Sequence, residues 1–83
     1  MSYQVEVVST AVQQIEKLNA QVQQQVMMKL EELALNPLPE GVKNLEAEKH
    51  LYLVFLNQYR IVYQVQEEAS LIKVTKVAHL KDY

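Results

Sequence analysis

The hydrophobic residues of the N-terminal region change from a period of two to a helical period. The segment from Tyr3 to Val8 has hydrophobic residues at alternate positions, which predicts a strand with one buried face. Thr10 and Gln13 have the spacing of a capping box, in which the hydroxyl accepts a free backbone N–H at the start of a helix. We therefore expect a first helix to begin there. Its buried side would consist of Ala11, Ile15 and Leu18.

A second amphipathic helix is expected from Asn19 to about Leu35. Asn19 is a favoured N-cap residue, because its side-chain oxygen can accept a backbone N–H of the first turn. The hydrophobic residues that follow at helical spacing are Val22, Val26, Leu30 and Leu33. Residues 36–41 contain both prolines and the single glycine of the chain, which interrupt regular structure. This segment therefore predicts a loop between the helices and the rest of the chain.

Three further strands are expected in the second half of the chain. They are Leu51 to Leu56, Tyr59 to Gln66 and Ser70 to Ala78, all rich in β-branched, aromatic and other hydrophobic residues. Short connections make them antiparallel neighbours, and the first strand either joins an edge of their sheet or lies between two of them. The fold class is therefore α+β in the order β-α-α-β-β-β. Two N-terminal helices pack on one face of a four-stranded antiparallel-rich sheet, and the other face stays open.

Length and composition exclude several classes of protein. A chain of 83 residues has room for one domain, residues 1–83. The absence of cysteine excludes disulfides, thiolate metal sites and cysteine nucleophiles, and it fits a reducing, cytoplasmic location. The sequence contains no secretory leader pattern and no apolar run of the ~20 residues that span a membrane. It also lacks a glycine-rich phosphate loop, paired histidines at metal spacing and a serine triad pattern, so we expect neither a cofactor nor a metal.

The charge is distributed unevenly along the chain. The net charge of −2 weighs against non-specific binding of nucleic acid, which depends on lysine and arginine. However, residues 1–40 hold two basic and five acidic side chains, whereas residues 41–83 hold six basic and five acidic ones. Any site for a polyanion is therefore expected in the second half.

Several short segments carry patterns that are more specific than periodicity. They are Tyr3-Gln4-Val5, Ile15-Glu16-Lys17-Leu18, Asn36-Pro37, Gly41-Val42-Lys43-Asn44-Leu45, Tyr59-Arg60-Ile61-Val62-Tyr63-Gln64-Val65 and Val77-Ala78-His79-Leu80-Lys81-Asp82-Tyr83. In this order and at this spacing they resemble the RelE/ParE toxin superfamily across nearly the whole chain. The resemblance implies a RelE-like fold and a toxin of a type II toxin–antitoxin system. It also implies three kinds of partner: a cognate antitoxin, the ribosome with its mRNA and, through the antitoxin, operator DNA.

RelE-like members cut mRNA in the ribosomal A site, where the ribose 2′-hydroxyl attacks the adjacent phosphate and the 5′-oxygen leaves. The resemblance implies catalytic roles for Arg60, His79, Lys81 and Tyr83. Arg60 would hold the phosphate, His79 would act as a general acid near neutral pH, Lys81 would add positive charge and Tyr83 would stack on an RNA base. The alternatives are a surface ion pair for Arg60, an ordinary strand end for His79, a solvated charge for Lys81 and a frayed terminus for Tyr83. We expect Arg60, His79 and Tyr83 to converge on one surface.

The chain departs from the RelE pattern at three basic positions. The basic pair that RelE-like enzymes carry before the turn falls on Leu53 and Phe55, and Leu80 replaces an arginine of the C-terminal segment. In the RelE frame Leu53 and Phe55 lie on the uncovered sheet face, where apolar side chains suit an antitoxin helix laid in a groove. A one-residue shift of the alignment would instead place both in the core.

Two functions follow from these observations. The leading hypothesis is a ribosome-dependent mRNA endoribonuclease, or mRNA interferase, that inhibits translation. The alternative is a non-nucleolytic binding protein on the same fold, either a gyrase inhibitor of ParE type or a catalytically impaired toxin that still binds its antitoxin.

Overall fold

The order of elements follows the predicted pattern, with one strand added. The computed structural model describes residues 2–45 and 50–82. Within these residues the elements are β1 (Gln4–Val7), α1 (Ser9–Glu16), α2 (Ala20–Leu35), β2 (Lys43–Asn44), β3 (Leu51–Leu56), β4 (Tyr59–Gln66), β5 (Leu71–His79) and a 3₁₀ turn, η1 (Leu80–Asp82). The short strand β2 gives the sheet five strands where the sequence predicted four.

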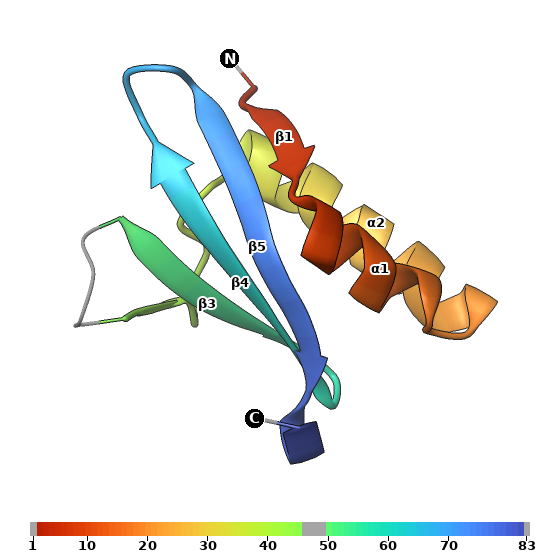
Figure 1. The fold of residues 1–83 in the computed structure, drawn as a ribbon. Coiled ribbons are helices and arrows are strands. Elements are labelled where there is room, and N and C mark those ends of the chain that lie inside the picture. The colour runs from red at the N-terminus through yellow and green to blue at the C-terminus, as the bar shows by residue number, and fades with distance from the viewer. Residues whose placement is uncertain (1, 46–49, 83) are drawn as a thin grey trace.

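The five strands form one mixed sheet in the order β1-β5-β4-β3-β2. Strands β2 to β5 are antiparallel to their neighbours, whereas β1 lies at an edge and runs parallel to β5. A parallel pair needs a long crossover connection, and the two helices together with β2 to β4 supply it. Figure 1 shows β1 beside β5, with α1 continuing from the end of β1.

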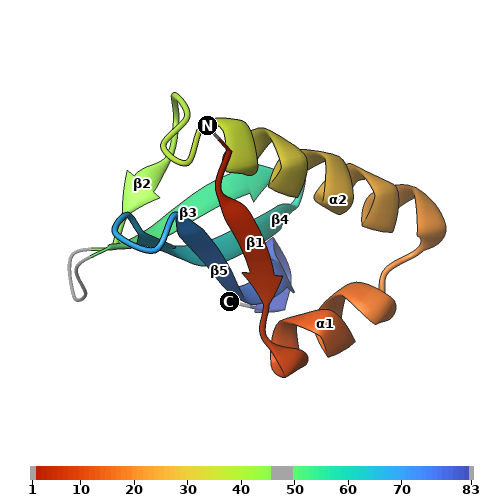
Figure 2. The same cartoon turned by 90° about the horizontal axis from the view of Figure 1, so that it is seen from above.

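Both helices lie on one face of the sheet, as predicted (Figure 2). Hydrophobic side chains from α1 and α2 pack there against alternate residues of the strands, which forms the core. Tyr63 of β4 is among the largest fully buried side chains in this core. The buried members are Ala11, Val26, Leu30, Leu33, Val54, Ile61, Tyr63, Val65, Ile72, Val74 and Val77.

The two helix starts were predicted with different success. The side chain of Asn19 accepts a hydrogen bond from Val22 N at 2.9 Å and caps α2, which confirms the predicted N-cap. The capping box at Thr10 is wrong, because α1 begins at Ser9 and its N-cap residue, Val8, makes no side-chain capping bond. The N–H of Val8 still donates to Val74 O at 3.0 Å, so the chain passes directly from the strand into the helix.

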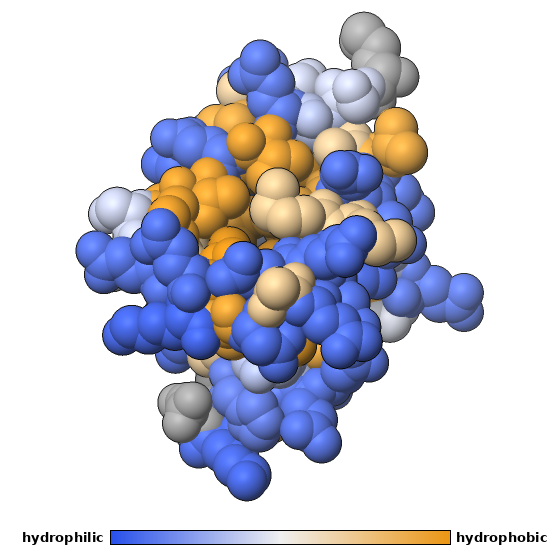
Figure 3. Space-filling view, turned by 90° about the vertical axis from the view of Figure 1, so that its right-hand side faces the viewer, coloured by the Kyte–Doolittle hydropathy of each residue, from blue (hydrophilic) through white to orange (hydrophobic). Residues whose placement is uncertain are grey.

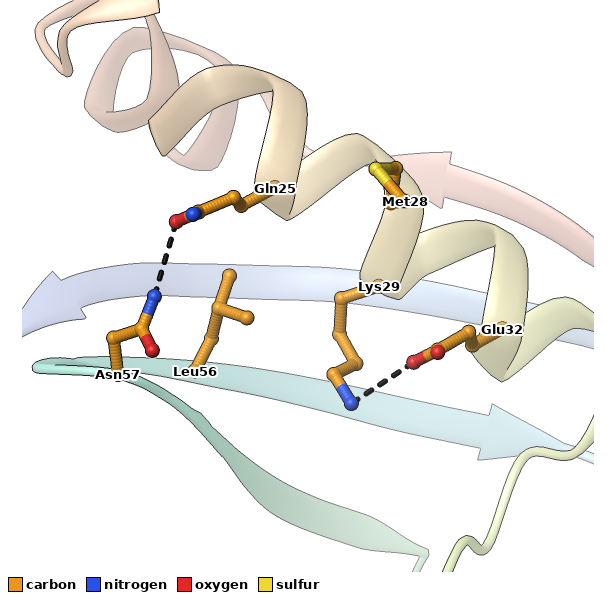
Figure 4. Close-up of a pocket in the computed structure, with 6 residues that line it drawn as sticks. All are labelled: Gln25, Met28, Lys29, Glu32, Leu56 and Asn57. Carbon is orange, nitrogen blue, oxygen red and sulfur yellow. Dashed lines mark hydrogen bonds and ion pairs between the residues drawn. The ribbon is translucent and has the colours of Figure 1, made fainter. Parts of the chain in front are cut away.

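A two-residue turn between β3 and β4 connects the sheet to α2. Asn57 adopts a positive φ of 55°, which asparagine tolerates well, and its Nδ2 donates to Gln25 Oε1 at 3.0 Å (Figure 4). A hollow of about 290 Å³ lies between this turn and α2, and the Lys29–Glu32 ion pair of 2.9 Å borders it. The exposed Met28 borders it too, and Figure 3 shows other hydrophobic side chains on the surface of the helix side. Among the described helices, none has the length and apolar character needed to cross a bilayer.

Candidate functional site

One face of the sheet is turned away from α1 and α2, and we call it the open face (Figure 2). Val54 of β3 belongs to the core under the helices, so its neighbours Leu53 and Phe55 point to the open face. Leu53 is 5% exposed there and Phe55 is 43% exposed. The alignment of β3 with the RelE pattern is therefore confirmed, and the alternative alignment, shifted by one residue, is wrong.

Arg60 extends from β4 onto the open face. Its register partners are Phe55 on β3 and Ala78 on β5, so all three side chains share that face. The Nε atom of Arg60 is buried, while the residue as a whole is partly exposed. The planar guanidinium matches a phosphate group through two parallel hydrogen bonds.

A β-bulge in β5 brings Lys76 to the same face. The register shifts between Val62 and Tyr63 of β4, which pair with Lys76 and Val74, so Thr75 is the additional residue. Thr75 Oγ1 donates to Val62 O at 3.3 Å and ties the bulge to β4. Without the bulge, strict alternation would direct Lys76 into the core. With the bulge, Lys76 points to the open face.

Lys43 reaches the open face from β2, the strand at the other edge of the sheet. Its register partner on β3 is Leu53, and its Nζ lies 5.5 Å from the centroid of the Phe55 ring. This is a cation–π arrangement, which holds the ammonium group above the sheet. Lys43, Leu53, Val62 and Lys76 thus form one row across four strands.

Three cations therefore lie in two neighbouring rows of the open face. Arg60 and Lys76 are diagonal neighbours on β4 and β5, a relation that usually separates Cα atoms by about 7–8 Å. Lys43 lies at the other end of the Lys76 row. The remaining members of both rows are hydrophobic, so these rows supply positive charge without a carboxylate or an imidazole.

His79 does not join Arg60, and the predicted convergence of these two residues is wrong. His79 is in register with Tyr59, one position from the Arg60–Ala78 pair, so its side chain points to the opposite face of the sheet. The ring centroids of Tyr59 and His79 are 5.1 Å apart in an edge-to-face contact. The Nδ1 atom of His79 accepts a hydrogen bond from Lys81 N at 3.0 Å, and its Nε2 atom lies 3.2 Å from Gln58 Oε1.

The last two predicted site residues are in the C-terminal segment. Lys81 lies in η1 and its side chain is exposed. The turn is anchored by Leu80 N, which donates to Gln58 O at 2.8 Å, and by the bond from Lys81 N to His79. Tyr83 lies outside the described residues. The roles predicted for Lys81 and Tyr83 therefore stay predictions.

Sequence reasoning missed Lys43 and Lys76 as members of the site. Lys43 belongs to a strand of two residues, which is too short to give a periodic signal. Lys76 would have been assigned to the wrong face, because period-two alternation carries no information about a bulge. The described residues contain no group of three or more His, Asp or Glu side chains that could hold a metal ion.

The architecture and the open face define a class of small toxin with a RelE-like fold. The isolated RelE toxin of E. coli matches with a TM-score of 0.83 and 30% identity, over 94% of this chain and 84% of that chain. The archaeal RelE–RelB complex from Pyrococcus horikoshii OT3 contains a chain that matches with a TM-score of 0.85 and 25% identity, over 95% of this chain and 96% of that chain. No curated protein sequence matches the chain.

The family of this chain is shown by its match to a protein-family model. The model for the ParE toxin of type II toxin–antitoxin systems, parDE, matches residues 5–82. The chain therefore belongs to this ParE toxin family within the RelE/ParE superfamily, and it is a toxin of the type II toxin–antitoxin class.

Proposed function

We propose that this protein is a ribosome-dependent mRNA endoribonuclease that inhibits translation from the open face of its sheet. The observation that carries the proposal is the placement of Lys43, Arg60 and Lys76 in two neighbouring rows of that face. RNA cleavage of this type gathers negative charge on the phosphoryl oxygens, and fixed cations stabilise that charge. The likeness to the RelE toxin of E. coli at 30% identity supports the same assignment.

In the proposed reaction the ribose 2′-oxygen bonds to the adjacent phosphorus while the bond from phosphorus to the 5′-oxygen breaks. The 2′-hydroxyl loses a proton and the leaving 5′-oxygen gains one, which yields a cyclic phosphate and a 5′-hydroxyl. Arg60 holds the phosphate, and Lys43 and Lys76 add positive charge beside it. Lys81 and Tyr83 stay in the proposed site as members of the C-terminal segment. His79 does not, because it lies on the opposite face.

We further propose that a cognate antitoxin silences the toxin. The RelE toxin of E. coli is found with RelB in the intact RelBE complex, which matches this chain with 29% identity and a TM-score of 0.83 over 94% of this chain and 96% of that chain. An occupant of the open face would cover the three cations, and the exposed ring of Phe55 offers it an apolar anchor.

One observation favours the alternative of a non-nucleolytic binding protein. Leu53 and Phe55 occupy the open face where RelE-like enzymes carry a basic pair. In addition, the rows of Arg60 and Lys76 contain no carboxylate or imidazole that could transfer a proton. On this alternative the open face would bind a protein target or the antitoxin without chemistry.

A translating extract programmed with a defined message separates the two functions. New 5′ ends in the A-site codon are mapped with wild-type protein and with Arg60→Ala. The matched control is Lys73→Ala, which removes one positive charge from the same face two rows away, opposite Gln64. Cleavage that Arg60→Ala abolishes and Lys73→Ala retains supports the nuclease. Equal cleavage by all three forms removes Arg60 from the chemistry, and no cleavage with translation unaffected leaves the binding alternative.

A further inference from the structure

Among the described strands, none pairs with the outer edge of the C-terminal half of β5, and α1 lies beside this edge instead. Strand β1 pairs with β5 only as far as Val7 and Val74, after which the chain turns into α1, which packs against β5. There the N–H of Val77 donates to the side chain of Gln14, at 2.7 Å to Oε1. A side chain thus replaces the missing strand at this point, and Figure 1 shows that α1 begins beside β5 where β1 ends.

A hollow of about 440 Å³ lies between α1 and this edge, and we call it the β5-edge hollow. Its wall includes Leu18, and Tyr59 and His79, whose rings are in contact. Those rings belong to the sheet face opposite Arg60, so the hollow lies mainly beside α1, and Lys76 and Ala78 connect it to the open face around the β5 edge. Its volume falls within the range of roughly 300–1,000 Å³ that small ligands occupy in proteins.

The hollow combines positive charge with a fixed aromatic pair. Lys17 and Lys76 contribute to its wall, and the described wall contains no carboxylate. His79 Nδ1 accepts a hydrogen bond from Lys81 N, so a neutral imidazole carries its proton on Nε2. The bonds to Lys81 and Gln58 hold the imidazole in place against Tyr59.

We propose that the β5-edge hollow binds one nucleotide of a single-stranded RNA. The base lies against the Tyr59–His79 pair, and the adjacent phosphate meets Lys17. Aromatic stacking beside a cationic rim is the usual way in which proteins bind unpaired nucleotides. Lys76 lies on the open face by register and also borders the hollow, so an RNA strand can pass around the β5 edge from one site to the other. The identification of this RNA as mRNA rests on the proposed function.

Titration of the full-length protein with adenosine 5′-monophosphate, followed by amide NMR shifts, tests the proposal. We expect shifts centred on Lys17 and residues 77–79. Ribose 5-phosphate, which lacks the base, should bind at least about fivefold more weakly, because stacking of one base contributes about 1–3 kcal/mol. The Lys17→Gln variant should bind about three- to fivefold more weakly, as expected for an exposed ion pair. Lys29→Gln is the matched control and should bind as the wild type does.

Several outcomes would overturn the proposal. Absence of shifts at the hollow, or equal binding of the two phosphates, would exclude a nucleotide site. Wild-type affinity in Lys17→Gln would exclude the phosphate contact, and tighter binding of an acidic peptide at the same amides would make the hollow a protein-binding site. The Arg60→Ala variant keeps this result distinct from the proposed function. It should retain the shifts at the hollow, whether or not translating extracts show cleavage by the wild-type protein.

Discussion

The side chain of Tyr63 links the sheet to the loop that follows α2. Tyr63 is 0% exposed, and its hydroxyl donates to Pro37 O at 2.7 Å, in the loop after α2. Burial, with a smaller contribution from Tyr52, raises the pKa of the Tyr63 hydroxyl to about 12. The neutral phenol is therefore part of the folded structure, and both its hydrogen bond and its protonation state can be tested.

Tyr63→Phe should reduce the free energy of unfolding by about 1 kcal/mol near pH 8, because the ring stays and one buried hydrogen bond is lost. The deficit should shrink as the pH rises from 10 towards 12. In that window the unfolded chain releases the tyrosine proton at about 10 while the folded wild type keeps it, so the stabilisation present below pH 10 is lost. Urea unfolding at pH 8 and pH 11 measures both values. A deficit that stays constant between the two would contradict the raised pKa.

For individual residues, the sequence did not decide which face of the sheet each side chain occupies. It left open whether Leu53 and Phe55 lie on the uncovered face or in the core, and the structure places both on the open face. The prediction failed for His79, which lies one residue after Ala78 and therefore points to the opposite face. The family pattern gives the position of a residue in the chain but not the face on which its side chain lies. The same limit explains why Lys76 was missed.

Among the elements, α2 and α1 begin in different ways, which gives a matched pair of variants. Asn19→Ala removes the side-chain acceptor for Val22 N and should lower the free energy of unfolding by about 1 kcal/mol. Thr10→Ala should have almost no effect, since Thr10 lies inside α1 and is exposed. Urea unfolding of both variants measures the difference. A cost for Thr10→Ala equal to that for Asn19→Ala would restore the capping box that the structure rejects.

The bulge at Thr75 decides which face the last part of β5 presents. Deleting Thr75 removes the extra residue, so Lys76 directly follows Val74, and strict alternation keeps Lys76 on the open face and Val77 in the core. We therefore expect cooperative unfolding to persist, with a loss of about 0.5–3 kcal/mol in the free energy of unfolding from the lost bond and the local change of backbone. Thr75→Ala is the control, because it keeps the bulge and loses only the 3.3 Å bond to Val62 O. Circular dichroism with urea measures both variants, and loss of cooperative unfolding in the deletion alone would mean that β5 needs the bulge itself and not only the alternation of its faces.

Strong periodicity explains which elements were predictable. The regular spacing of Val26, Leu30 and Leu33 identified α2, and a run of β-branched, aromatic and other hydrophobic residues identified β4, the strand that carries Arg60. The two residues of β2 and the extra residue of β5 have no periodic signature, because both depend on which strand lies opposite. These two irregular features are the ones that place Lys43 and Lys76.

For the whole molecule, the open face carries cations from three strands, and under the proposed nuclease function this distribution predicts a dependence of cleavage on the ribosome. The rows that hold Lys43, Arg60 and Lys76 contain no carboxylate or imidazole that could transfer the two protons. A site that supplies mainly charge needs a substrate already held in a reactive geometry, which a ribosome-bound mRNA provides. Purified protein should therefore leave free RNA uncut, while the same preparation cleaves mRNA in a translating extract.

The double variant Lys43→Ala/Lys76→Ala tests whether these lysines supply the charge missing at Leu53 and Phe55. Loss of one preorganised stabilising group costs about 10²–10³ in rate, so cleavage in extracts should fall by at least 10². The control Lys29→Ala/Lys73→Ala removes the same charge and should cleave within a few-fold of the wild type. Lys29 belongs to α2, and Lys73 lies on the side of the Lys43–Lys76 row that is turned away from Arg60. If both double variants lose cleavage equally, net charge alone guides the protein to the ribosome. If both keep it, the cations of the Lys43–Lys76 row have no part in the reaction, and Arg60 must act with groups of the C-terminal segment or of the ribosome.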